Sequence, residues 1–98
     1  MPEIETLRRQ VDAIDGELLR LLSRRAQLAV EIGILKRKSG LSVHSSARER
    51  ALLLRARREN TGPLDEPAIT RLFRLIIQES KRAAEISSEP VPVSEASE

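Results

Sequence analysis

The 98-residue sequence contains no cysteine, tryptophan or tyrosine, and its only aromatic residue is Phe73. Without cysteine, the chain has neither disulfides nor thiolate metal ligands. A single aromatic ring gives no platform on which exposed nucleic-acid bases could stack. The chain also lacks a long apolar run and a recognisable signal peptide, so we expect a cytoplasmic protein without a membrane partner.

What the sequence has is an apolar stripe in residues 3–38, where aliphatic residues recur at spacings of three and four, as in one long amphipathic helix. The stripe consists of Ile4, Leu7, Val11, Ile14, Leu18, Leu21, Leu28, Ile32 and Leu35. A helix over these residues is about 54 Å long, whereas a compact chain of this length has a radius of gyration of roughly 13 Å. The far end of the helix must therefore be covered by a second copy, and we expect a homodimer.

Arg25 interrupts this stripe, because it stands where the pattern requires an aliphatic residue between Leu21 and Leu28. A guanidinium on a packing face is costly unless an anion meets it, so Arg25 indicates an anion-binding site. Lys36 returns to nearly the same face about 16 Å further along the axis. Two cations on either side of an apolar patch at Ile32 suit a dicarboxylate that carries a hydrocarbon ring.

Two shorter helices are expected to follow. The first covers about residues 46–59, and Ser46 and Glu49 have the spacing of a capping box. The second covers about residues 65–85, with Asp65 as its N-cap. Its buried stripe consists of Ile69, Leu72, Phe73, Ile76 and Ile77, and is continued by the small residues Ser80 and Ala84.

The remaining segments carry no predicted chemistry. Residues 1–86 are expected to form one helical domain, and residues 87–98 a disordered tail. The tail sequence SSEPVPVSEASE is acidic, interrupted by proline and too poor in apolar residues to pack. His44, the only histidine, has no second histidine or carboxylate close by in the connection between the first two helices, so we assign it to the surface.

Several polar residues keep two interpretations at this point. Lys36 also belongs to a basic helix end, and Glu49 fits equally well as a surface cap. Ser80 either bonds back to its own helix or offers its hydroxyl to a ligand. In a two-fold dimer with antiparallel long helices, Arg8 of one chain would complete the site of the other. Its neighbour Arg9 carries the same charge, and spacing alone does not choose between the two.

Four segments, in this order and spacing, resemble the all-helical (AroQ-type) chorismate mutases: LRRQVDAID, LLRLLSRRAQLAVEIGILK, RERALL and ITRLFRLIIQES. The similarity covers roughly residues 4–84. It implies an all-α fold with three helices per chain, intertwined into a homodimeric bundle with two shared sites. It also implies that the protein is an isomerase that converts chorismate to prephenate, on the way to phenylalanine and tyrosine, without a cofactor or metal.

The resemblance implies roles for individual residues as well. The carboxylates of the substrate would be bound by Arg25, Ser80 and, from the other chain, Arg8. Lys36 would contact the ether oxygen and a carboxylate, and Glu49 would bind the ring hydroxyl. Further positive charge and an apolar wall would come from Arg48, Ile32, Leu52 and Ile77.

Three positions depart from the family pattern. The family often has an acid where Ser45 stands, near the ring hydroxyl, and an aliphatic residue where Lys81 stands. It usually has glutamine or glutamate in place of Ala84, where that side chain helps to bind the ether oxygen. Either Lys36 carries this role alone, or the helix shifts, or the activity is low, and we expect Ala84→Gln to raise turnover.

Two other functions stay open on the sequence. An isochorismate-pyruvate lyase would use the same fold and similar charges on a related substrate. Alternatively, the chain is a non-catalytic helical dimer that binds a regulatory partner, or binds nucleic acid through Arg55, Arg57 and Arg58. Because that second function leaves Arg25 unexplained, and because the motifs match the mutases more closely than the lyase, we predict a chorismate mutase that binds no nucleic acid.

Overall fold

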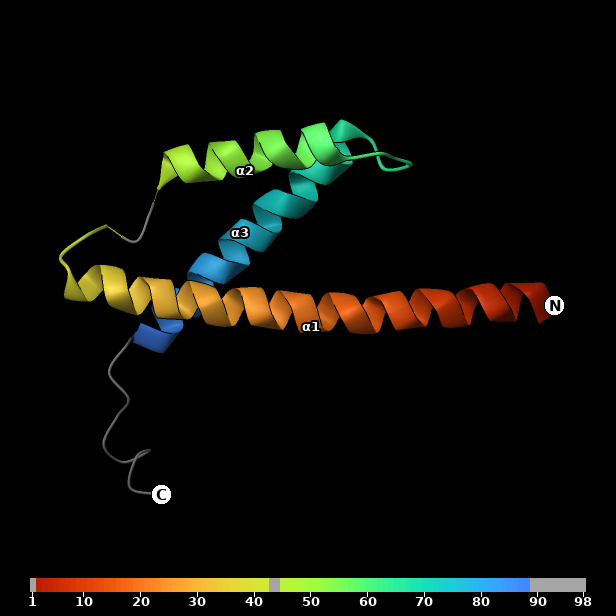
Figure 1. Ribbon diagram of the computed structural model, residues 1–98, viewed down its shortest axis with the longest axis horizontal. Helices are drawn as coiled ribbons and strands as arrows, with labels where there is room; N and C mark the ends of the chain where they lie inside the picture. The colour runs from red at the N-terminus through yellow and green to blue at the C-terminus, as the bar shows by residue number, and fades with distance from the viewer. Residues whose placement is uncertain (1, 43–44, 89–98) are drawn as a thin grey trace, which may run out of the picture.

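The computed structural model describes residues 2–42 and 45–88, and these residues form three helices and no strand. The helices are α1 (Pro2–Lys38), α2 (Ser46–Glu59) and α3 (Glu66–Ser88). In Figure 1, α1 is a long rod that α3 crosses obliquely, and α2 is joined to the far end of α3. The predicted all-helical class and the order of the helices are confirmed.

The ends of α1 and α3 lie close to the expected residues. Basic residues occupy the last turn of α1, and Gly40 follows with a φ of 71°, as in a glycine-terminated helix. Asp65 caps α3 as predicted, since its Oδ1 accepts from the Ala68 amide at 2.9 Å. α3 continues to Ser88, two residues beyond the expected end of the helical domain at residue 86. The rest of the predicted tail and His44 lie outside the described residues.

The cap of α2 differs from the prediction by one residue. Ser45, not Ser46, has the extended backbone of an N-cap, and its hydroxyl accepts from the amide of Arg48 at 3.3 Å. The capping box was therefore expected one residue too late, because the N-cap is Ser45 and not Ser46.

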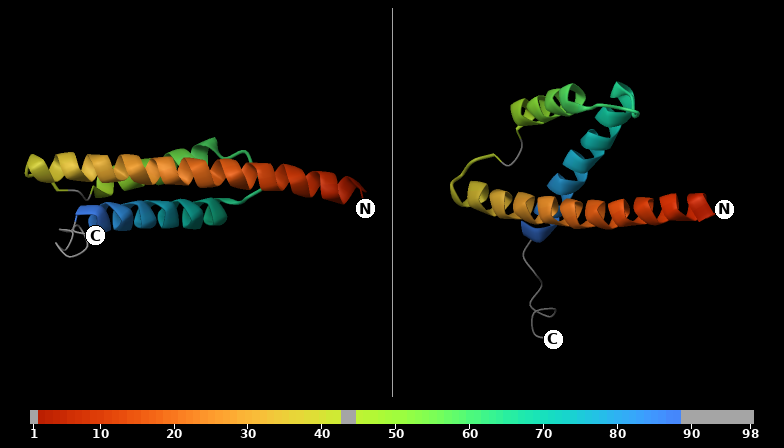
Figure 2. Two further views of the ribbon diagram at one scale, coloured as in Figure 1. Left: turned by 90° about the horizontal axis from the view of Figure 1, so that it is seen from below. Right: turned by 45° about the vertical axis from the view of Figure 1, so that its right-hand side comes forward.

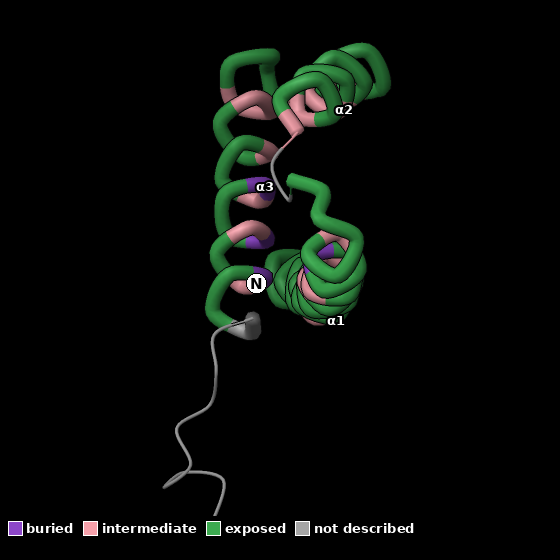
Figure 3. The backbone as a smooth tube through the Cα atoms, turned by 90° about the vertical axis from the view of Figure 1, so that its left-hand side faces the viewer, coloured by how far each residue is buried: buried purple, intermediate pink, exposed green. Residues whose placement is uncertain are grey.

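The core lies where α3 meets the other two helices. α3 contacts both α1 and α2, whereas α1 and α2 do not approach each other closely within the described residues. The buried residues Ile77, Ser80 and Ala84 lie on the inner side of α3, as the tube in Figure 3 shows. At the crossing, the Cβ of Ala84 is 3.5 Å from the position that a Cβ on Gly33 would occupy. The glycine inside α1 thus permits a close helix crossing.

The apolar stripe of α1 is not the face on which α3 packs. Every stripe residue from Ile4 to Leu35 is at least 44% exposed. α3 instead crosses a neighbouring face of α1 (Figure 2), on which Gly33 is buried and Ala26 and Ala29 are half-buried, and such small residues allow close approach. The radius of gyration is 17.8 Å, larger than the roughly 13 Å of a compact chain of this length. In the part of the chain that is described, no helix has the length and apolar character needed to cross a membrane.

Candidate active site

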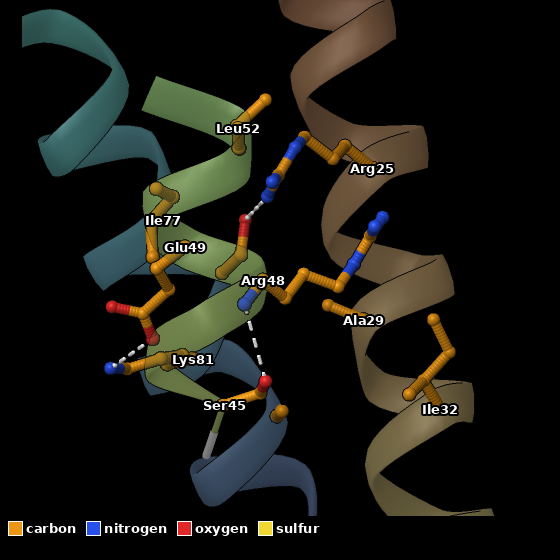
Figure 4. Close-up of a pocket in the computed structure, with 11 residues that line it drawn as sticks. Arg25, Ala29, Ile32, Ser45, Arg48, Glu49, Leu52, Ile77 and Lys81 are labelled. Atoms are coloured by element: carbon orange, nitrogen blue, oxygen red, sulfur yellow. Dashed lines mark hydrogen bonds and ion pairs between the residues drawn. The ribbon is translucent and has the colours of Figure 1, made fainter. Parts of the chain in front are cut away.

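A pocket of about 130 Å³ lies where the three helices converge (Figure 4). All three helices contribute, and α2 contributes through its capping residue and first two turns. The residues that line the pocket are Arg25, Ala29, Ile32, Ser45, Arg48, Glu49, Leu52, Ile77, Ser80, Lys81 and Ala84. The packing of the helices therefore brings together residues that are more than 50 positions apart in the sequence.

Arg25 is held in the pocket by α3. Its Nη1 donates to the hydroxyl of Ser80 at 2.6 Å, and Ser80 is only 7% exposed. Ser80 was expected to bond either to its own helix or to a ligand, whereas in this bond its hydroxyl accepts from Arg25. A hydroxyl is neutral, so the bond fixes the guanidinium without cancelling its charge. The arginine that interrupts the stripe is thus a positioned cation beside a cavity.

Arg48 brings a second guanidinium to the same pocket. It belongs to the first turn of α2, and Figure 4 shows its side chain extending from α2 towards α1, near Arg25 and Ala29. Two like charges that face one cavity repel each other, and an anion placed between them lowers the energy. This wall of the pocket therefore favours a ligand with carboxylates.

Glu49 and Lys81 form an ion pair that joins α2 to α3 at the pocket. The Nζ of Lys81 donates to Oε2 of Glu49 at 2.9 Å, and the side chains of Lys81 and Glu49 are 34% and 28% exposed, respectively. In Figure 4 the two side chains point towards one another. Glu49 thus lines the pocket and bridges α2 to α3 through Lys81.

The floor of the pocket is apolar. It is formed by the predicted residues Ile32, Leu52, Ile77 and Ala84 together with Ala29. Ala84 is 2% exposed and offers no side-chain donor. Sequence reasoning missed Ala29, although it follows Arg25 by four residues and so shares its helix face. It also left Lys81 out of the site, although Lys81 follows Ile77 at the same spacing.

Two predicted site residues lie outside this pocket. Lys36 is half-buried in the last turn of α1, one turn beyond Ile32, but does not line the cavity. Arg8 is exposed in the first third of α1, which extends away from α2 and α3 in Figure 1. All other predicted site residues line the pocket, so a single chain assembles most of the expected set but not these two cations.

Comparison with known proteins gives consistent matches. The family model of chorismate mutase type II matches residues 7–85. The chain is 40% identical over 81 residues to the bifunctional chorismate mutase/prephenate dehydratase of Aquifex aeolicus, and 45% identical over 75 residues to that of Escherichia coli K12. These matches cover 79% and 76% of this chain but 22% and 19% of those proteins, so the chain spans about a fifth of their length.

A solved structure matches over a much larger share of its length. The chorismate mutase (form II) of Thermus thermophilus superposes with a TM-score of 0.82 at 38% sequence identity. The match covers 85% of this chain and 94% of that one.

Proposed function

Because the chain belongs to the chorismate mutase type II family, we propose that it rearranges chorismate to prephenate as a homodimer whose two sites use residues of both chains. In this reaction one C–O bond breaks and one C–C bond forms within the same molecule, so no atom is gained or lost. The observation that carries the proposal is the pocket in which Arg25 and Arg48 meet over an apolar floor. The expected cytoplasmic location is part of the same proposal.

The first task of the site is to hold a flexible dianion in its compact, reactive conformation. Guanidinium groups suit this task because they bind carboxylates with two parallel hydrogen bonds. Arg25 is already oriented by the buried Ser80, so little ordering is left to be done when the ligand binds. Holding the reacting ends together in this way lowers the entropic part of the barrier.

The second task is to stabilise the negative charge that develops on the ether oxygen. We assign this to Lys36, which has a long side chain and lies on the same helix as Arg25, one turn beyond Ile32. A preorganised donor of this kind is typically worth about 10²–10³ in rate. Ala84 supplies no donor of its own, so Ala84→Gln is expected to raise kcat a few-fold, measured as prephenate formation at saturating chorismate.

The dimer is supported by the apolar surface that one chain leaves uncovered. Besides the stripe of α1, a groove of about 540 Å³ runs between α1 and α3. It is lined mostly by apolar residues, namely Leu18, Leu22, Ala26, Leu72, Phe73, Leu75 and Ile76. Leu72, expected in the buried stripe of α3, is 48% exposed in this groove. A contiguous apolar surface of this kind marks an interface in a soluble chain.

A second copy offers the matching surface, because its own α1 carries the same stripe. With the two long helices antiparallel, Arg8 of the partner subunit would lie beside the middle of this α1, close to Arg25. The small size of the pocket agrees with a missing wall. Its volume of about 130 Å³ is below the roughly 300–1,000 Å³ of typical ligand pockets.

The decisive experiment follows chorismate loss and prephenate formation with the purified chain, alongside a parallel reaction with isochorismate. We expect prephenate from chorismate and no pyruvate from isochorismate. Pyruvate release without prephenate would instead identify a lyase on this fold. Turnover of neither substrate would contradict an enzymatic role and favour a non-catalytic helical dimer.

A further inference from the structure

Lys81 brings a third cation to the pocket, and the proposed function does not use it. Its ammonium lies 2.9 Å from Glu49 Oε2, and about two thirds of each side chain is shielded from water, with exposed fractions of 34% and 28%. Charges that are partly removed from water interact more strongly than charges on a fully exposed surface. Lys81 therefore belongs to the electrostatics of the pocket.

Within a single chain, the charges that line the cavity balance a dianion only when Lys81 is included; Lys36 and the partner subunit's Arg8, proposed above, would add to them. Arg25, Arg48 and Lys81 are positive and Glu49 is negative, so these four side chains carry a net charge of +2. Without Lys81 the sum is +1, and the carboxylate of Glu49 faces an anionic ligand without its ion-pair partner on α3. That carboxylate would repel the ligand.

Neighbouring residues of α3 set both parts of this charge arrangement. Ser80 fixes the guanidinium of Arg25, which comes from α1, and Lys81 fixes the carboxylate of Glu49, which comes from α2 (Figure 4). Because α3 contacts both other helices, its two adjacent side chains hold the cation and the carboxylate in a defined relation. Lys81 is thus anchored on the helix that organises the site.

We propose that Lys81 is a specificity-determining residue: by compensating the charge of Glu49, it makes the pocket select dianionic over monoanionic ligands of the same ring size. The inference rests on the proposed function only in placing a ring dicarboxylate in this pocket. The electrostatic free energy from one cation scales with the charge of the ligand. Loss of that cation therefore weakens the binding of a dianion more than the binding of a monoanion.

Isothermal titration calorimetry of the full chain with isophthalate and benzoate tests this, since the two probes share a ring and differ by one carboxylate. Lys81→Gln keeps a hydrogen-bond donor but removes the charge. We expect it to lower the affinity for isophthalate about tenfold, or 1.4 kcal/mol. The affinity for benzoate should fall about threefold, as the ratio of ligand charges requires. Lys81→Arg should keep the selectivity.

Lys38→Gln is the matched control, because Lys38 is an exposed lysine in the last turn of α1 outside the pocket. It should leave both affinities unchanged. Equal weakening of both ligands by Lys81→Gln, unchanged isophthalate affinity, or failure of the wild type to bind either anion would each overturn the inference. Binding is measured without turnover, so absence of chorismate turnover with intact charge selectivity would count against the proposed function alone.

Discussion

The two halves of α1 share one apolar periodicity but have different surroundings. Residues 2–21 carry the stripe from Ile4 to Leu21 with every member at least 47% exposed. In residues 25–38, α3 covers the neighbouring small-residue face, and Arg25 and Ile32 line the pocket. The same pattern thus serves two purposes along one helix: one half builds a site, and the other presents a surface that a second chain can cover.

The largest effect is expected from a charge on the exposed half. Ile14→Asp places a carboxylate on the stripe, where burial against a partner would strip it of water. We expect a monomer by analytical ultracentrifugation and a loss of more than about 10³ in kcat/KM, since the contacts of a whole wall are lost. Ala13→Asp adds the same charge at an exposed position off the stripe. It should remain dimeric and active. A dimeric, active Ile14→Asp chain would contradict the shared-site dimer.

The next largest effect belongs to the covered half. Arg25→Ala removes the cation held by Ser80, and we expect kcat/KM to fall by about 10²–10³ while the dimer persists. Arg20→Ala is the control, because Arg20 is exposed on another face of the same helix. Full activity of the Arg25 variant, measured by chorismate consumption, would refute the site.

Mixing two variants tests whether the halves cooperate across chains. Arg8→Ala and Arg25→Ala homodimers should each be nearly inactive. In a mixed dimer, one site would draw an intact Arg25 from one chain and an intact Arg8 from the other. Re-equilibrating equal amounts should therefore restore about a quarter of wild-type activity, as two-fold symmetry requires. No recovery in a mixture shown to contain mixed dimers would mean that Arg8 does not act in the partner's site.

Much of this arrangement could be predicted from the sequence, because helix periodicity places residues on faces. The helix of residues 2–38, the seam position of Arg25 and the pocket residues Ser80 and Ile77 all follow from spacing or from the family resemblance. Which face of α1 receives α3 could not be read in the same way. The longest apolar stripe was the natural candidate for the packing face, whereas α3 crosses over Gly33 and its small neighbours.

Side-chain partners were harder still to foresee. The bond from Arg25 to Ser80 and the pair of Lys81 with Glu49 link residues that are 55 and 32 positions apart. Such contacts depend on the crossing geometry of α3, which no local pattern specifies. The capping role of Ser45 in place of Ser46 reflects the same limit on a smaller scale, because a serine at either position satisfies the sequence rule.

The smallest effects should come from the two glycines inside α1, one in each half. In an exposed helix interior, glycine costs about 1 kcal/mol relative to alanine. At Gly16 an added Cβ would meet only the flexible end of Arg20 at 3.6 Å. Gly16→Ala should therefore stabilise the chain by nearly this amount. At Gly33 the Cβ would lie 3.3 Å from the guanidinium of Arg37 and 3.5 Å from Ala84.

The side chain of Arg37 can move away at little cost, but the helices cannot easily separate at Ala84. Gly33→Ala should therefore raise the free energy of unfolding less than Gly16→Ala. Urea denaturation at a fixed protein concentration compares the two free energies of unfolding. A larger increase in stability at Gly33 than at Gly16 would mean that the helices are loosely packed where they cross. Close packing would then not explain why α3 meets α1 over its small residues.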